Sequence, residues 1–356
     1  MRRAAKGIAI AAGAAAAAAA IERRLIAAPH YRGPITDHFD GERFHNLQPA
    51  RQGDGSFIKW MLNRERGYWR EWVDATPGPP PPRSVGDGEL RITFINHATT
   101  LIQLDGINIL TDPIWSDRTS PVSFTGPHRH RPPGIRFEDL PPIDLVLVSH
   151  NHYDHLDVAT LKRLKRPRIF TPLGNGAFMR RHGIVATELD WWESVAAGAS
   201  PAAGPAGAPA PTQITLVPSQ HFCARGLTDR DRNLWGGFVI ASKSGNVYFA
   251  GDSGWGDHFA AIGKRFQPIR LALLPIGAYM PRWFMKPVHI DPAEAVQAHQ
   301  VLKAQTSVAI HFGCFALGDD GEFEPVRDLQ TAIAANGNPR FWILEHGEGR
   351  DVPPCD

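Results

Sequence analysis

Four side chains that can bind a metal ion lie within six residues near the middle of the chain, and all belong to the segment SHNHYDHLD: His150, His152, Asp154 and His155. Neutral imidazole and carboxylate are ligands for zinc and similar divalent ions. His150 and His152 stand two residues apart, and in extended backbone this spacing projects both rings to the same side. The segment therefore predicts part of a metal site, whose other ligands must come from elsewhere in the chain.

Three more residues of the same kind follow apolar stretches far along the chain. His221 follows QITLVPSQ, Asp252 follows VYFAG and His311 follows SVAI. A carboxylate or imidazole at the end of an apolar strand is costly unless it has a partner. The loops above the carboxyl ends of strands are where α/β folds place their sites. We therefore expect these side chains to converge with the first four on one cleft.

Seven ligands exceed the four positions of one tetrahedral ion and suit two ions that share a carboxylate. The expected ligand sets are His150, His152 and His221 for one ion, Asp154, His155 and His311 for the other, and Asp252 as the bridge. Two ions so held would lower the pKa of a bridging water, which suits hydrolysis of a phosphodiester and equally of a lactone or thioester. Zinc is the expected metal, two ions per chain, and the ligand types leave iron and manganese open.

Short strands are expected to deliver these residues. RITFI, TLIQL and INILTD predict three strands between Leu90 and Asp112, and Asp105-Gly106 predicts a two-residue hairpin turn. The apolar segment IDLVLVS leads into the metal-binding loop, and a helix is expected from about Val158 to Leu164. Asp112 also ends a strand, so we expect it to orient a ligand imidazole, with turn capping as the alternative. His97 is expected to be a structural hydrogen-bond partner.

Three segments divide the chain. Residues 1–28 are rich in alanine and begin with basic residues, and their three interpretations are a membrane anchor or interfacial helix, a cleaved signal, and a plain helical or frayed tail. Residues 29–84 form an extension with an amphipathic helix from Ser56 to Val73, lying on the core or contacting a membrane, and a Pro-rich linker from Thr76 to Ser84. The main domain is expected at residues 85–356, with a flexible insertion from Ala196 to Pro211.

Composition narrows the function classes. The chain has 356 residues, 43% hydrophobic and 21% charged, as globular proteins have, and its net charge of +2 gives no attraction to nucleic acid. Three scattered cysteines supply neither a disulfide framework nor a CxxC zinc motif, so any metal must be held by histidines and carboxylates. Within residues 85–356, six histidines receive no role and are expected mostly at the surface: His128, His130, His182, His258, His299 and His346.

HNHYDHLD resembles the HxHxDH signature of the metallo-β-lactamase superfamily, and the later His, Asp and His follow in that superfamily's order. Longer stretches resemble its branch of N-acylphosphatidylethanolamine-hydrolysing phospholipase D enzymes and cover most of Arg91 to Arg350: TDPIWSDRTSP, GPHRHR, LPPIDLVLVSHNHYDHLD, ELDWWE, PSQHFCAR, FAGDSGW, IGKRF, PIGAYMPRWFMKPVHIDPAEAV, IHFGCFAL and LEHGE. Two parts depart from this pattern. The insertion is longer than the connection in the family, and the Ala-rich amino terminus has no counterpart there.

The resemblance implies an α/β fold over residues 85–356, an αββα sandwich of two facing mixed β-sheets flanked by helices, with the dinuclear site at one edge. It also implies a zinc phosphodiesterase that hydrolyses N-acylphosphatidylethanolamine-type glycerophospholipids to phosphatidic acid and N-acylethanolamine through a metal-bridging hydroxide. Asp154, Asp252 and Asp112 are expected to serve catalysis through the metal site. His289 lies in a family-like stretch and is expected to contact the substrate phosphate or the leaving group.

The expected partner is a phospholipid, with peripheral membrane contact and no nucleic acid. Trp283, Phe284 and Met285 lie beside Arg282 and Lys286, which suits docking on an anionic bilayer, with core packing as the alternative. The expected location is cytoplasmic or membrane-associated, with export by a signal left open, and oligomeric state is not predicted. Two rival functions are a metallo-hydrolase of the same fold acting on a small soluble ester, lactone or phosphodiester, and a metal-binding protein without turnover. The intact ligand set argues against the latter.

Overall fold

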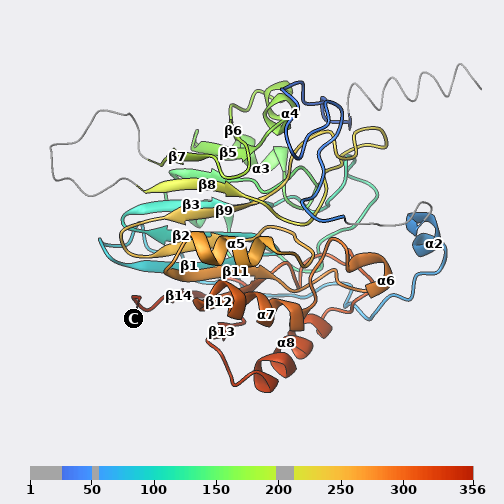
Figure 1. Ribbon diagram of the computed structural model, residues 1–356. Coiled ribbons are helices and arrows are strands. Elements are labelled where there is room, and N and C mark those ends of the chain that lie inside the picture. Colours follow the sequence, from blue (N-terminus) through green and yellow to red (C-terminus); the bar gives the residue numbers. More distant parts are fainter. Residues whose placement is uncertain (1–25, 50–55, 198–211, 356) are drawn as a thin grey trace, which may run out of the picture.

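The computed structural model describes residues 26–49, 56–197 and 212–355. Two seven-stranded β-sheets face each other, and helices lie outside them (Figure 1). The strand orders are β14-β1-β2-β3-β4-β5-β6 and β13-β12-β11-β10-β9-β8-β7. Both sheets contain parallel and antiparallel pairs. The αββα sandwich of two mixed sheets is therefore confirmed.

The first sheet joins an antiparallel meander to a parallel half. Its strands are β1 (Leu90–Asn96), β2 (Thr99–Leu104), β3 (Ile107–Thr111), β4 (Leu145–Leu147), β5 (Arg168–Pro172), β6 (Thr187–Leu189) and β14 (Gly349–Asp351). The turn from β2 to β3 is the predicted one: Asp105 and Gly106 have φ of 50° and 82°, the left-handed conformations that such a turn requires. From β3 to β6 the pairing is parallel, so the carboxyl ends of these strands share one edge.

The second sheet also consists of an antiparallel part and a parallel part. Its strands are β7 (Ser194–Ala196), β8 (Gln213–Val217), β9 (Gly237–Ala241), β10 (Asn246–Phe249), β11 (Ile269–Pro275), β12 (Ala304–Ile310) and β13 (Phe341–Trp342). The pairs from β7 to β10 are antiparallel, and those from β10 to β13 are parallel. Strands β9 and β10 form an antiparallel hairpin. The carboxyl ends of β10 and β12 therefore point to the same edge.

The helices are α2 (Ser56–Leu62), α3 (Val158–Arg163), α4 (Asn175–Arg181), α5 (His258–Arg265), α6 (Arg282–Met285), α7 (Pro292–Leu302), α8 (Glu324–Ala335) and the 3-10 helix η2 (Phe137–Asp139). The short helices α2 and α6 lie next to each other beyond one end of the strands (Figure 1). Asp157 caps α3 by accepting a hydrogen bond from the amide nitrogen of Ala159. Asp291 and Glu294 form a capping box at the start of α7, whose first residue is Pro292.

Successive side chains of β4 alternate between two hydrophobic cores, one on each face of the first sheet. Leu145 and Leu147 of β4 face the core between the sheets, whereas Val146 and Val148 face a second cluster that includes side chains of α3 and α4. Successive side chains of a strand point to opposite faces, so a continuous apolar run is what a strand buried on both faces needs. This burial holds β4 rigid directly before the loop that begins at Ser149.

The helix predicted from Ser56 to Val73 is wrong in its length, because α2 ends at Leu62. The backbone beyond it forms hydrogen bonds with distant segments: the Gly67 amide nitrogen donates to the carbonyl oxygen of Asp319, and that of Val73 to His130. Gly67 also lies so close to the backbone of Gly321 that a Cβ would sit 2.3 Å from its nitrogen. These tertiary contacts replace the hydrogen bonds that a longer helix would make.

The amino-terminal segment and the insertion fall largely outside the described residues. Of the Ala-rich segment only residues 26–28 are described, and of the insertion only Ala196, which ends β7, and Ala197. Within the described ranges, no helix is long and apolar enough to span a membrane. The extension contributes Phe39 and Phe44 to the core between the sheets. The proposed boundary at residue 85 stays a prediction.

Candidate metal centre

The seven residues predicted as metal ligands come together at the shared edge of the two sheets. His150, Asp252 and His311 lie just beyond the ends of β4, β10 and β12. His221 follows β8 after a short loop. Six of the seven side chains belong to buried residues, and only His152 is partly exposed. The strand ends therefore deliver polar side chains to one buried place.

The first group of ligand atoms surrounds one point. His150 Nε2 lies 2.8 Å from His152 Nδ1, and His221 Nε2 lies 3.3 Å from that same atom. Asp252 Oδ2 lies 3.6 Å from His221 Nε2 and 3.9 Å from His150 Nε2. An ion with tetrahedral ligands at about 2.0–2.1 Å keeps neighbouring ligand atoms about 3.3 Å apart. These four residues have the spacing of one such site.

The second group lies on the other side of Asp252. His155 Nε2 lies 3.2 Å from Asp154 Oδ2 and 3.1 Å from Asp252 Oδ2. His311 Nε2 lies 3.5 Å from Asp154 Oδ2 and 3.2 Å from Asp252 Oδ1. Asp252 is thus the carboxylate that faces both groups. The arrangement has the form that two ions with one shared ligand require.

Several of these atoms are buried without a hydrogen bond. Within the described residues, His155 Nε2, His311 Nε2 and Asp252 Oδ1 have no hydrogen-bond partner. Buried polar atoms are nearly always paired, so three unpaired atoms that face one another need an explanation. Two imidazole nitrogens and a carboxylate oxygen at this spacing form a donor set for a divalent ion. The residues present therefore fit the metal that the ligand pattern predicts.

The histidines of the first group are neutral at pH 7. Burial lowers the pKa of His150 well below its usual value, that of His152 to about 4 and that of His221 to about 3. Only an unprotonated ring nitrogen has a lone pair for a metal. These rings therefore stand ready to bind an ion at neutral pH.

In the second group of candidate ligands, the carboxylates favour the positively charged forms of the histidines. Burial disfavours the charged forms of His155 and His311, but the carboxylates of Asp252 and Asp154 outweigh it and raise both pKa values, to about 9 for His311. Burial likewise opposes ionisation of the two carboxyls, yet the neighbouring histidines keep both pKa values well below the usual range. A divalent ion at this point would supply the same positive charge and displace the protons.

Asp112 lies behind the two groups, where the sequence predicted a residue that orients imidazoles. Its Oδ2 accepts hydrogen bonds of 2.6 Å from His155 Nδ1 and 2.6 Å from Ser149 Oγ. Ser149 Oγ in turn accepts from His150 Nδ1 at 2.9 Å. The Nδ1 protons are thereby directed away from the cluster and the Nε2 atoms toward it. Burial raises the pKa of Asp112, which is fully enclosed.

Two further histidines border the cluster. His97 Nε2 donates a hydrogen bond of 2.8 Å to Asp154 Oδ2, which is the structural hydrogen bond that the sequence predicted. The ring of His289 lies 5.1 Å from that of His221 and 5.5 Å from that of His311, centroid to centroid. Burial lowers the pKa of His289 to about 3, so its ring is neutral. His289 contributes to the cavity wall beside the cluster.

A cavity of about 520 Å³ lies in front of the cluster. Its inner wall includes His152, Asp154, Asp252, His289 and His311, and its outer part includes apolar side chains of α2 and α6. Trp60 of α2 stacks on Phe284 of α6, with ring centroids 4.9 Å apart. Phe284 and Met285 are buried, as the core-packing interpretation expects, and Trp283 is 52% exposed. Docking of this cluster on a bilayer stays a prediction. Sequence reasoning missed the contribution of α2 to this wall.

The expectation that the six unassigned histidines lie mostly at the surface is wrong. His130, His258 and His299 are buried, His182 and His346 are partly buried, and only His128 is exposed. The buried rings have hydrogen bonds: His130 to the carbonyl oxygen of Arg70, His258 to Ser253 Oγ and His299 to Ser307 Oγ. An imidazole can be buried when it has a hydrogen-bond partner. These partners are either far away in the sequence or form no recognisable sequence pattern, so the burial was not predicted.

Comparisons with known proteins agree with this geometry. The “Beta-lactamase superfamily domain” family matches residues 107–312. The “N-acyl-phosphatidylethanolamine-hydrolyzing phospholipase D 1” of Caenorhabditis elegans is 42% identical over 274 residues, 72% of this chain and 74% of that protein. The “N-acyl-phosphatidylethanolamine-hydrolyzing phospholipase D, mitochondrial” of Saccharomyces cerevisiae is 32% identical over 264 residues, 72% of this chain and 54% of that protein. The solved structure of an isothiocyanate hydrolase from Delia radicum gut bacteria is similar in fold, with a TM-score of 0.57 and 20% identity over 74% of this chain and 99% of that chain.

The matched segment, residues 107–312, contains all the predicted metal ligands, and it contains the strands that bring them together. The two phospholipase D relatives match the greater part of the chain at more than 30% identity. The chain therefore belongs to the metallo-β-lactamase superfamily, in its N-acylphosphatidylethanolamine-hydrolysing phospholipase D-like branch, and is a metal-dependent hydrolase.

Proposed function

We propose that the protein is a dinuclear zinc phosphodiesterase that hydrolyses N-acylphosphatidylethanolamine-type glycerophospholipids to phosphatidic acid and N-acylethanolamine. The observation that carries this proposal is the cavity of about 520 Å³, which joins the candidate ligands to apolar side chains of α2 and α6. A lipid substrate needs a polar end for its phosphodiester and an apolar wall for its acyl chains. The names of the two phospholipase D relatives state this same substrate.

Two ions would be held by two sets of candidate ligands. His150, His152 and His221 would hold the first ion, Asp154, His155 and His311 the second, and Asp252 would serve both. When bound, two divalent ions supply an activated water and neutralise charge on the phosphoryl group. Hydrolysis adds the hydroxyl of water to phosphorus and a proton to the oxygen of the departing N-acylethanolamine. Asp112 keeps the Nε2 atoms of His150 and His155 directed at the ions, through Ser149 and directly.

His289 is placed to contact the substrate. It borders the cavity between the candidate ligands and the apolar wall, and burial lowers its pKa to about 3. A neutral imidazole can donate a hydrogen bond from one nitrogen and accept at the other. In this role His289 binds a phosphoryl oxygen or the leaving oxygen without adding charge to the site.

Apolar side chains around the cavity suit contact with a lipid surface. Ile58 and Leu62 of α2, Trp283 of α6 and Leu227 are exposed, Leu227 to 93%. Figure 1 shows α2 and α6 next to each other, and Phe57 and Leu227 also line the cavity. The ammonium of Lys59 lies 5.0 Å from the ring of Trp283. Exposed apolar groups beside cations bind anionic bilayers, which supports the proposal of peripheral membrane contact.

The proposal is tested by incubating metal-loaded protein with vesicles that contain N-acylphosphatidylethanolamine and by following both products by mass spectrometry. The wild type is expected to release phosphatidic acid and N-acylethanolamine in equal amounts. Asp252→Asn weakens the shared ligand, and its rate is expected to fall by about 100-fold or more, since metal ligation supplies several kcal/mol of transition-state stabilisation.

A soluble phosphodiester serves as the comparison substrate in the same experiment. Wild-type protein with two ions per chain that releases neither lipid product refutes the lipid substrate. If such protein still turns over the soluble compound, the activity is that of a metallo-hydrolase for small molecules.

A further inference from the structure

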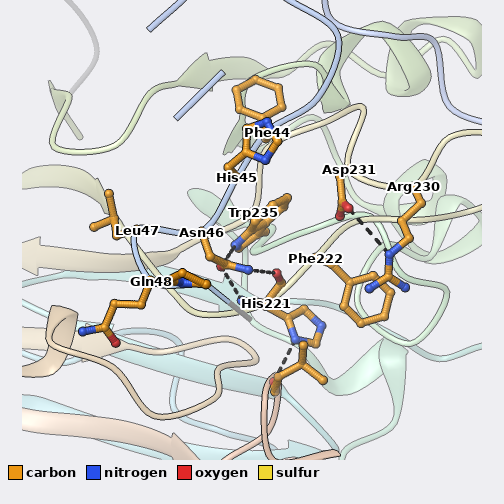
Figure 2. A pocket seen from close by; sticks show the side chains of 12 residues that line it. Phe44, His45, Asn46, Leu47, Gln48, His221, Phe222, Arg230, Asp231 and Trp235 are labelled. Carbon is orange, nitrogen blue, oxygen red and sulfur yellow. Dashed lines mark hydrogen bonds and ion pairs between the residues drawn. The ribbon is translucent and has the colours of Figure 1, made fainter. Parts of the chain in front are cut away.

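The side chain of Asn46, in the N-terminal extension, forms two hydrogen bonds with the main chain of the candidate ligand His221 (Figure 2). Asn46 Nδ2 donates to the carbonyl oxygen of His221 over 2.8 Å, and Asn46 Oδ1 accepts from its amide nitrogen over 3.0 Å. The same Oδ1 accepts a bond of 3.1 Å from Nε1 of the buried Trp235. A side-chain amide has both a donor and an acceptor, so it pairs with a peptide as a neighbouring strand would.

His221 lies in a loop beyond the end of β8, to which Pro218, Ser219 and Gln220 connect it. Gln220 forms an isolated antiparallel bridge with Gly254, and the main chain of the next residue, His221, pairs with the side chain of Asn46. The ring of His221 is oriented by a separate bond of 2.9 Å from Nδ1 to the carbonyl oxygen of Val288. That bond sets the rotation of the ring, and the two bonds from Asn46 set the position of its main chain.

Neighbours of Asn46 attach the extension to the same region. The carbonyl oxygen of Gln48 accepts a bond of 2.8 Å from Gln220 Nε2. The amide nitrogen of Phe44 donates to the carbonyl oxygen of Asp231 over 2.7 Å, and the ring of Phe44 is buried in the core between the sheets. The segment 44–48 precedes residue 107, where the superfamily match begins. One contact to the candidate metal centre therefore comes from outside the matched domain.

We propose that Asn46 is a positioning residue for the metal centre, and that the N-terminal extension completes the first metal site by holding His221 in place. This inference rests on the proposed metal site. Coupling between two binding events is reciprocal. If docking of residues 38–48 strengthens metal binding, metal binding must strengthen the docking of residues 38–48 by the same factor.

Metal affinity tests the proposal without reference to lipid hydrolysis. Zinc is titrated into chelator-treated full-length protein in competition with a chromophoric chelator. Asn46→Ala is expected to weaken one of two binding steps by about 10–100-fold, the effect of losing a group that orients a ligand, and to leave the other step unchanged. Leu47→Ala, which alters an exposed neighbour, is expected to bind both ions as the wild type does.

A second control separates positioning from general stability. Leu329→Ala removes a fully buried side chain from α8, which is separate from the segment 38–48, and lowers stability. It is expected to leave both affinities unchanged. Equal weakening by Leu329→Ala and Asn46→Ala, or wild-type affinity in Asn46→Ala, would overturn the role of Asn46.

Hydrogen exchange provides the reciprocal measurement. Zinc is expected to slow amide exchange of residues 38–48 in the wild type, and this protection is expected to be lost in Asn46→Ala. Zinc binding with no change in exchange there contradicts the coupling. Wild-type protein that binds no divalent ion refutes the metal site and this role of Asn46 together. Wild-type protein that binds two ions but leaves N-acylphosphatidylethanolamine intact refutes the lipid substrate alone.

Discussion

Asp112 shows how a single residue connects the candidate ligands with the sheet behind them. It follows β3 with a φ of 32° and accepts bonds from the amide nitrogen and hydroxyl of Ser149 and from His155 Nδ1. These partners lie 37 and 43 residues further along the chain, so the bonds orient a distant loop and an imidazole and are not the local bonds of a turn cap. Its burial makes it sensitive to any change of charge or shape.

Replacing Asp112 tests the orientation of the ligands. Both oxygens of the Asp112 carboxylate accept hydrogen bonds. Asp112→Asn replaces one oxygen by an amide NH2 group, which is a donor, so a donor of Ser149 or His155 must lose its acceptor. We expect metal affinity to fall by about 10–100-fold. The number of ions retained after dialysis against a weak chelator measures this, with Asp351→Asn, whose side chain is 82% exposed, as the matched control. Equal retention by the two variants would contradict the orienting role.

His299 gives a prediction of pH dependence away from the metal site. Burial lowers its pKa from the usual 6.5, so the folded protein holds the ring neutral while the unfolded chain protonates it below that pH. The contribution of the neutral His299 ring to the free energy of unfolding is therefore fully present above pH 6.5 and is lost as the pH falls below 6.5. The loss is at most about 1.4 kcal/mol per pH unit.

The contribution of His299 is measured as a difference between two proteins. Urea unfolding of wild type and His299→Gln is compared at about pH 7.5 and about pH 5.5, because all other groups titrate alike in both. The wild type is expected to lose more stability between these conditions than the variant does. An identical loss in both would mean that His299 is already protonated in the fold.

Among the elements, α2 and α6 decide what lies around the cavity. The seven-residue α2 is too short to be stable by itself. Trp60 holds it by stacking on Phe284 and by donating from Nε1 to Asp319 Oδ2 at 3.0 Å. One face of α2 thus lies on the protein, and its Ile58 and Leu62 point to solvent. Packing on the core, one of the two interpretations from sequence, is confirmed for the face that carries Trp60, and membrane contact by the other face stays a prediction.

Substitution on the outer face of α2 tests membrane contact. Ile58→Ser combined with Leu62→Ser removes two exposed apolar side chains, each worth about 1.5–3 kcal/mol when buried in lipid. We expect binding to anionic vesicles to weaken by about 100-fold or more, as measured by sedimentation. Val185→Ser, an equally exposed apolar site between α4 and β6, is the control and is expected to bind as the wild type does. Loss of binding in the control alone would place the contact on another face.

At the scale of the whole molecule, the candidate centre connects the two sheets. His150 follows β4 of the first sheet, whereas Asp252 and His311 follow β10 and β12 of the second. An ion shared by ligands from both sheets stabilises their packing only in the folded protein. Metal binding is therefore expected to contribute to stability as any ligand of the native state does.

Metal removal measures this contribution. At a free zinc concentration of about 100 times the dissociation constant, each site should add about 2.7 kcal/mol to the free energy of unfolding. Urea unfolding with zinc and with chelator gives the difference, and Asp252→Asn, which lacks the shared carboxylate, should show a smaller one. A wild-type midpoint that is the same with and without chelator would show that no ion joins the sheets.

The fold and the ligand set were predictable where the signals are local. The i, i+2 spacing of His150 and His152, the Asp105-Gly106 turn and the Asp291-Pro292 helix start each lie within a few residues, and backbone geometry limits what such patterns can form. Apolar runs that end in a histidine or aspartate identified the other ligands by the same reasoning.

Tertiary structure alone decided the rest, because contacts between distant residues leave no periodic pattern. Only the folded chain shows that α2 ends at Leu62, where distant hydrogen bonds replace those of the helix, and that His258 and His299 are buried with hydroxyl partners. The same holds for Asn46, whose two bonds to His221 join residues on separate segments of the chain. The sequence by itself determined which side chains could bind metal, and the packing of the sheets and the extension decided where their atoms point.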